Sequence, residues 1–252
     1  MKTDTLLIAT AMALLIVAAI VASEGVNEPL FLWFNHSAGV LPDLFWANMT
    51  FVADTLFAVA VIAMVGSRYP HIFNSGLVLL ILGALFVHGL KNLLEIPRPP
   101  AVLDPDVFKV IGPVVKNHAF PSGHSFTALA TAGLLAINMR NLPGAIALLL
   151  VAMTAAVSRA AVGAHWPLDI LVGSAAGLLF ALIAQRLTDS LWWLQGKGLE
   201  RFAAGLMTIT CATMLFHDSR YPGTQPLTIT AGLIALLLLT GYWRHTLLDM
   251  RK

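Results

Sequence analysis

The sequence predicts an all-α protein, a polytopic bundle of transmembrane helices. Hydrophobic residues make up 58% of its 252 residues and charged residues only 11%, and the mean hydropathy is +0.81. A soluble domain carries about 25% charged residues, so this chain has too few to cover a surface in water. No segment alternates like a strand of a membrane barrel. Eight apolar runs have about the length of a spanning helix. They lie near residues 6–22, 44–65, 77–96, 121–137, 145–162, 167–184, 202–216 and 227–243.

The composition also excludes several classes of protein. A soluble enzyme and a disordered chain are excluded by the hydropathy, and a net charge of +2 is too small for nucleic-acid binding. The single cysteine, Cys211, lies in an apolar run and excludes a disulfide framework. The first apolar run, preceded by Lys2, resembles a signal peptide. We interpret it as a retained anchor because the rest of the chain is also apolar.

Basic residues in the expected loops favour an orientation with both chain ends in the cytoplasm. Three basic residues then face the other side: Lys109, Lys116 and Arg220. Nine face the cytoplasm: Lys2, Arg68, Arg140, Arg186, Lys197, Arg201, Arg244, Arg251 and Lys252. The short loops are typical of a bacterial inner-membrane protein, whose outer loops face the periplasm.

Ionisable residues within or beside the apolar runs collect in one leaflet when the helices alternate in direction. These residues are Asp54, His88, Lys91, Glu95, His124, Arg159 and Asp169. Charges in lipid are costly and need a reason. Exposed helix ends explain Glu95, Asp54 and His88, but not the whole set. We therefore expect a polar pocket in the outer half of the bundle.

A first motif places Lys91 seven residues before Arg98, which precedes Pro99. Seven residues are two helical turns, so the two cations could share one face of a helix. A lone lysine near a helix end more often extends its amine toward water.

A second motif is the segment Pro121-Ser122-Gly123-His124 at the expected start of a helix. Proline suits the first turn of a helix. The free N–H groups of that turn form an anion site, to which Ser122 adds a hydroxyl.

A third motif contains Ser158, Arg159, His165 and Asp169. Pro167 predicts that a helix begins there, so Asp169 lies near enough to accept the Nδ1–H of His165 and orient its ring. Arg159 is a forked donor that matches phosphate oxygens.

Together the motifs supply two histidines, three cations, one orienting carboxylate and a helix N-terminus. These groups suit phosphoryl transfer, because that reaction depends on positioning the reactants and on stabilising the charge of the phosphoryl oxygens. Histidine can also act as a covalent nucleophile.

The three motifs, K-x6-R-P, P-S-G-H and S-R-x5-H-x3-D, resemble those of the type 2 phosphatidic acid phosphatase (PAP2) superfamily of membrane lipid phosphatases. The resemblance covers about residues 44–184 and implies a six-helix core. We expect a PAP2-like catalytic core over residues 1–188. Residues 189–252 would form a C-terminal extension with two further transmembrane helices.

The resemblance also implies a mechanism. His165 would attack phosphorus to form a phosphohistidine while Asp169 holds its ring, and His124 would protonate the leaving oxygen and then activate water. The expected phosphate-binding residues are Lys91, Arg98, Ser122, Gly123 and Arg159. No metal or other cofactor is expected, because the cations supply the positive charge.

The expected substrate is a lipid phosphate or pyrophosphate, surrounded by membrane lipids. The candidates are undecaprenyl pyrophosphate, phosphatidylglycerophosphate, phosphatidate and lipid A phosphates. A lipid-phosphate transporter or flippase would also need the cations, but not the pair of His165 and Asp169. The vanadium-dependent haloperoxidases of the same superfamily use a similar set of residues to hold vanadate. They are soluble, and the composition of this chain argues against that interpretation. The lipid and the oligomeric state remain open.

Overall fold

The computed structural model describes residues 2–139 and 141–249, and within this part the regular structure is entirely helical. Arg140, Arg251 and Lys252, which we expect in the cytoplasm, lie outside the described residues. The α-helices are α1 (Lys2–Val21), α2 (Asn27–Ser37), α3 (Asp43–Val52), α4 (Thr55–Arg68), α5 (His71–Leu94), α6 (Pro99–Val102), α7 (Gly123–Asn138), α8 (Leu142–Ala161), α9 (Pro167–Ser190), α10 (Lys197–Thr213) and α11 (Gln225–Asp249).

Fewer helical segments have the length and apolar composition of a membrane span than the eight runs that the sequence predicts. Six helical segments are long and apolar enough to cross a bilayer, and seven if α3 and α4 count as one span bent by 59°. Each of the eight apolar runs does form helix. However, α7 has only 16 residues, or about 24 Å of helix, which is short of the roughly 30 Å hydrocarbon core.

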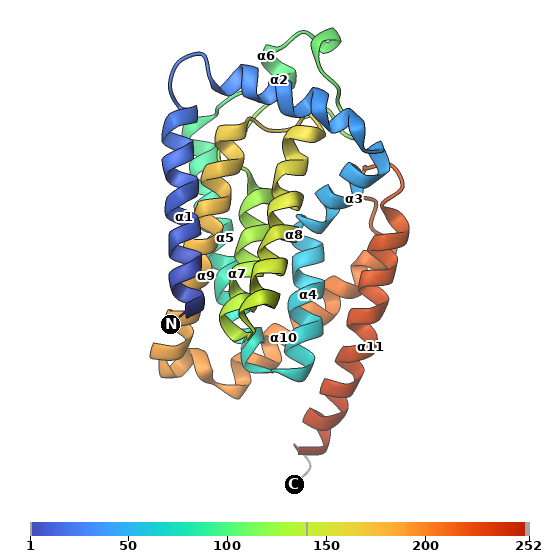
Figure 1. Cartoon of the computed structure of the whole chain (residues 1–252). Coiled ribbons are helices and arrows are strands. Elements are labelled where there is room, and N and C mark those ends of the chain that lie inside the picture. Colours follow the sequence, from blue (N-terminus) through green and yellow to red (C-terminus); the bar gives the residue numbers. More distant parts are fainter. Residues whose placement is uncertain (1, 140, 250–252) are drawn as a thin grey trace.

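The centre of the bundle is α7, packed between α8 and α9, with α1 on the outer side of α9 (Figure 1). Small residues allow these helices to approach closely, as is usual in membrane bundles. At Gly177 of α9, an added Cβ would overlap the backbone of Phe126 in α7. Leu129, Ala156 and Leu178 are fully buried in the cluster between these helices. The contact between α7 and α9 is therefore fixed by backbone proximity.

The two C-terminal helices pack elsewhere, against α4 and the first half of α5. Met207 and Cys211 of α10 are buried in one cluster with Ile62, Phe73 and Leu239, and Cys211 is a free thiol. The extension therefore joins the rest of the bundle mainly through α4. Figure 1 shows α11 on the side of the bundle opposite to α1.

A layer across one end of the bundle is formed by α2, which lies across the ends of the long helices (Figure 1). Asn35 fixes it there. Its Nδ2 donates to the carbonyl oxygens of Ala160 and Ala161, each at 3.1 Å, and its Oδ1 accepts from the backbone N of Lys109 at 2.8 Å. Both ends of the described chain lie at the other end of the bundle (Figure 1).

Candidate active site

All three motif segments meet at the end of the bundle that α2 covers. Lys91 lies in the last turn of α5, and Gly123 and His124 open α7. Arg159 lies in the last turn of α8, and Asp169 in the first turn of α9, with His165 in the loop between them. Helices that run in opposite directions thus deliver their ends to one place.

The first motif is not the continuous helix that its spacing suggested. The helix α5 ends at Leu94, Glu95 adopts a left-handed conformation with φ 46°, and Arg98 precedes the short helix α6. The expectation that Lys91 and Arg98 share one helical face is therefore wrong. Pro97 and Pro99 explain the difference, because a residue before proline disfavours the α conformation.

Arg98 is nonetheless turned into the bundle and is 8% exposed. Its Nε donates to the carbonyl oxygen of Asn117 at 2.8 Å, and its Nη1 donates to that of Ala164 at 3.2 Å. The guanidinium therefore joins the proline-rich loop to the residue just before His165. These bonds hold the first motif against the third.

Ser122 caps α7 and does not face the cavity. Its Oγ accepts hydrogen bonds from the backbone N and the Oγ of Ser125, at 3.3 and 2.8 Å, and Ser122 is fully buried. Its backbone N donates to the carbonyl oxygen of Asp169 at 3.1 Å. An added Cβ at Gly173 would lie 2.5 Å from the Ser122 carbonyl oxygen. The start of α7 is thus in direct backbone contact with α9.

In the third motif, His165 folds back over the end of α8, because its backbone N donates to the carbonyl oxygen of Arg159 at 3.1 Å. Its Nδ1 lies 3.1 Å from Oδ2 of Asp169, which also accepts from the backbone N of Trp166 at 3.0 Å. Trp166 in turn packs edge-on against Phe31 of α2. Beside an ionised Asp169, which can only accept, Nδ1 carries the proton and Nε2 keeps a free lone pair.

His165 is held in its neutral form by its surroundings. The side chain is 1% exposed, and this burial is the main reason that its pKa lies well below the usual 6.5. The positive charges of Arg98, Arg159 and Lys91 lower this pKa further. A neutral imidazole is the form that can act as a nucleophile.

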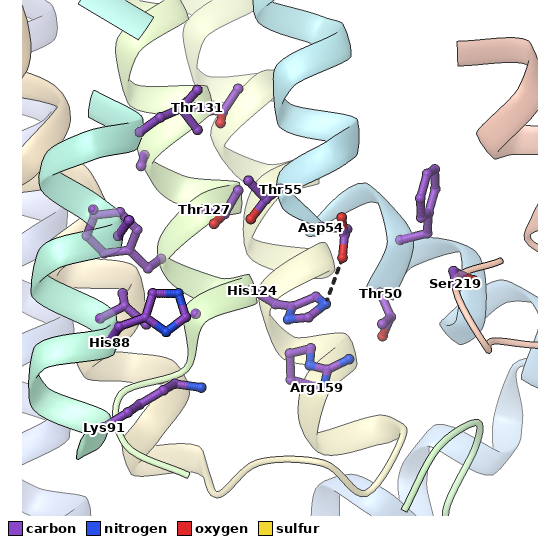
Figure 2. A pocket seen from close by; sticks show the side chains of 18 of the residues that line it. Thr50, Asp54, Thr55, His88, Lys91, His124, Thr127, Thr131, Arg159 and Ser219 are labelled. Atoms are coloured by element: carbon purple, nitrogen blue, oxygen red, sulfur yellow. Dashed lines mark ion pairs between the residues drawn. The ribbon is translucent and has the colours of Figure 1, made fainter. Parts of the chain in front are cut away.

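A cavity of about 460 Å³ lies beside these groups. Five of the eight predicted site residues line it: Lys91, Arg98, Gly123, His124 and Arg159. Ser122, His165 and Asp169 are not part of its lining and are nearly fully buried. Figure 2 shows Lys91, His124 and Arg159 directed toward a common space.

One end of the cavity is polar and the other is mainly apolar. Lys91, His124 and Arg159 occupy the polar end, whereas Thr127 and Thr131 lie further along α7 (Figure 2). The apolar part runs between α4, α5 and α7. Its lining residues are Ile62, Leu79, Leu80, Gly83, Ala84, Val87, Phe126 and Ala130.

Asp54 is part of the site, although from the sequence alone an exposed helix end was enough to explain its charge. Its Oδ2 lies 3.4 Å from Nε2 of His124, shown by the dashed line in Figure 2, while its Oδ1 accepts from the backbone N of Leu56 at 2.8 Å. Asp54 lies at the break between α3 and α4, within the apolar run over residues 44–65. The sequence signal for this break was Asp54 itself, because aspartate is a preferred N-cap residue and an apolar run follows it.

Other cavity residues come from outside the motifs. Thr50 of α3 lines it, and so do three residues of the loop between α10 and α11, namely His217, Ser219 and Tyr221. No spacing pattern connects that loop to the motifs. Within residues 2–139 and 141–249, no group of three or more His, Cys, Asp or Glu side chains is arranged to hold a metal ion.

Comparisons with known proteins agree with this geometry. The family model described as PAP2 superfamily matches residues 73–193, which carry all three motifs. The crystal structure of Aquifex aeolicus LpxE is 25% identical, with a TM-score of 0.55, covering 66% of this chain and 98% of that one. The first transmembrane PAP2 type phosphatidylglycerolphosphate phosphatase from Bacillus subtilis is 20% identical, with a TM-score of 0.54, covering 76% and 98%.

No curated protein matches the chain. The match to the second structure concerns the fold, whereas the family model coincides with the site itself. The family model ends at residue 193, before α10 begins. The three motifs, their convergence at one cavity and these matches identify residues 73–193 as a PAP2 superfamily region.

Proposed function

We propose that the protein is a membrane phosphatase that hydrolyses the phosphate monoester or pyrophosphate of a lipid through a phosphohistidine at His165. The observation that carries this proposal is the pair of His165 and Asp169, with Nδ1 and Oδ2 3.1 Å apart. The pair leaves Nε2 unprotonated, among three cations that lower the pKa of the ring. A site that only binds phosphate needs the cations but not an oriented, neutral imidazole.

In the first step, Nε2 of His165 attacks the terminal phosphorus, and the bond from this phosphorus to the leaving oxygen breaks. The leaving oxygen is the ester oxygen of a lipid monophosphate or the bridging oxygen of a lipid pyrophosphate. His124 gives its proton to that leaving oxygen. In the second step, His124 removes a proton from water and the resulting hydroxide attacks the phosphorus. The bond from phosphorus to Nε2 of His165 breaks, which frees the neutral imidazole and inorganic phosphate. Asp54, whose Oδ2 is 3.4 Å from Nε2 of His124, stabilises the protonated form of this ring.

Phosphoryl oxygens would be stabilised by Lys91, Arg98, Arg159 and the backbone N–H of Gly123. The buried Nε of Arg159 supports this assignment, because it has no hydrogen-bond partner in the described part of the chain. A buried donor without a partner is costly, and a substrate oxygen would satisfy it. We propose that Ser122 acts indirectly, through the helix that it caps.

The shape of the cavity supports an amphiphilic substrate. Its cationic end suits a phosphate, and its apolar part between α4, α5 and α7 suits a hydrocarbon chain. The Bacillus subtilis structure is a phosphatidylglycerolphosphate phosphatase, which makes phosphatidylglycerophosphate one candidate. Undecaprenyl pyrophosphate, phosphatidate and lipid A phosphates are the others. We propose that the cavity faces the periplasm, as the positive-inside rule predicts.

The test is release of inorganic phosphate from this panel of lipids by detergent-purified protein. Wild-type protein should release phosphate from at least one lipid, and His165→Ala should not. His71→Ala is the matched control, because His71 lies at the start of α5, outside this cavity. Binding of the lipids without any release by wild-type protein would instead support a transporter.

A further inference from the structure

The two C-terminal helices bring a loop into the cavity. Residues 217–224 connect η4 (Met214–Phe216) to α11, and His217, Ser219 and Tyr221 of this loop line the cavity. Figure 2 includes Ser219 of this loop, with Thr50 and Arg159, among the side chains that line the cavity. The extension therefore contributes part of the wall of the site that the motifs form.

Tyr221 makes a direct contact with one of the cationic site residues. Nη1 of Arg159 donates to the phenolic oxygen of Tyr221 at 2.7 Å, and the guanidinium carbon lies 5.7 Å from the centroid of the tyrosine ring. Arg159 is 3% exposed, and its Nε has no partner among the described residues. The N–H of Nη1 is thus fixed, while the N–H of Nε is available to a bound anion.

The chemistry of this contact is informative. A carboxylate beside Arg159 would neutralise its charge and compete with a phosphate, but no carboxylate in the described ranges lies within ion-pair distance of it. A phenol is neutral. It accepts one N–H and fixes the plane of the fork, while the full positive charge stays available to an anion.

The loop itself is held firmly around Tyr221. The backbone N of Tyr221 donates to Oγ of Ser219 at 3.2 Å, and its carbonyl oxygen accepts from Oγ1 of Thr224 at 2.9 Å. The ring packs over Gly112, which has a φ of +86° and where an added Cβ would lie 2.5 Å from a ring carbon. Thr224 is 2% exposed. The phenol therefore occupies a defined position.

We propose that Tyr221 is a positioning residue that holds the guanidinium of Arg159 for the phosphoryl group, so that the C-terminal extension completes the phosphate pocket. This inference rests on the proposed function for the identity of the anion. It assigns the extension a role in the site, in addition to its packing against α4.

The test compares Tyr221→Phe with wild-type protein, in activity and in binding of vanadate, a phosphate mimic. Removing the hydroxyl keeps the ring packing and loses one hydrogen bond to a charged group. We expect kcat/KM to fall about tenfold and the dissociation constant of vanadate to rise by a similar factor. The matched control is Tyr242→Phe in α11, which loses a 3.2 Å hydrogen bond to Glu200 away from the cavity. It should change neither quantity by more than about twofold.

A double-mutant cycle separates positioning from folding. If Tyr221 acts through Arg159, Tyr221→Phe should have almost no further effect on vanadate binding in an Arg159→Lys background. Equal losses in both backgrounds would overturn the inference, as would unchanged vanadate binding in the single variant. Vanadate binding does not require hydrolysis. If Tyr221→Phe weakens vanadate binding but the wild-type protein cleaves no lipid, the proposed function is refuted and the positioning role of Tyr221 stands.

Discussion

Two histidine–aspartate pairs lie at this site, and they differ in exposure and in distance. His165 and Asp169 are 1% and 3% exposed at the side chain, with Nδ1 and Oδ2 3.1 Å apart. His124 and Asp54 are both 29% exposed, with Nε2 and Oδ2 3.4 Å apart. A nucleophile benefits from a fixed ring, whereas an acid–base group must exchange protons with a leaving group and with water. The difference suits the two roles proposed for the rings.

The largest effect should come from the buried pair. Asp169→Asn removes the acceptor that keeps the proton on Nδ1 of His165, so the ring loses the tautomer with a free Nε2. We expect kcat to fall about 10³–10⁴-fold. Steady-state phosphate release checks this. A loss under about tenfold would mean that Asp169 only supports the fold.

The exposed ring should give a smaller loss that depends on the leaving group. His124→Gln removes the proton donor, and we expect a loss of about 10²–10³-fold with a lipid substrate. The loss should shrink with p-nitrophenyl phosphate, whose leaving group needs no proton. Comparing both substrates for His124→Gln and Asp169→Asn checks this. If both variants lose the same factor with both substrates, the two rings do not have separate roles.

Asp54→Asn should have a smaller effect than Asp169→Asn, because its pair is longer and more open to solvent. We expect about a tenfold loss of kcat with the lipid substrate, and little loss with p-nitrophenyl phosphate. Kinetics with both substrates measure this, and Asp43→Asn is a control, since Asp43 pairs with Lys109 at the surface. A loss as large as that of Asp169→Asn would contradict the comparison.

The pH dependence should reflect the neutral state of His165. Because burial and neighbouring cations lower the pKa of His165 well below 6.5, the ring stays unprotonated until the pH falls far below that value. The acid-side fall of kcat/KM that reports His165 should therefore begin below pH 6.5. A profile of kcat/KM against pH tests this. The profile could instead show a single acid-side limb centred at or above pH 6.5 that no substitution of His124 removes. That result would mean that the ring of His165 is protonated at neutral pH.

The same two pairs show how far the sequence could predict the site. His165 and Asp169 are four residues apart at a helix start marked by Pro167, so local geometry was enough to pair them. Asp54 and His124 are far apart in sequence. Their meeting requires the break between α3 and α4 and the packing of α4 beside α7.

The fold was predictable for a similar reason, since apolar runs report helices in a bilayer directly. The sequence did not show where the helices are interrupted. The break at Asp54 and the end of α5 before Arg98 depend on capping and on proline, which interrupt runs that look uniform in hydropathy. Tyr221 could not be found from spacing at all, because its contact with Arg159 depends on how the last two helices pack.

Trapping the covalent intermediate shows whether His165 is the nucleophile. Protein mixed with a lipid substrate labelled with ³²P at its terminal phosphate is quenched within milliseconds, kept at alkaline pH and digested. We expect an acid-labile label on the peptide that contains His165. The label should be absent from His165→Ala and present at a higher level in His124→Gln with an activated substrate. Full hydrolysis by wild-type protein with no label on that peptide, or retention of the label in His165→Ala, would mean that His165 is not the nucleophile.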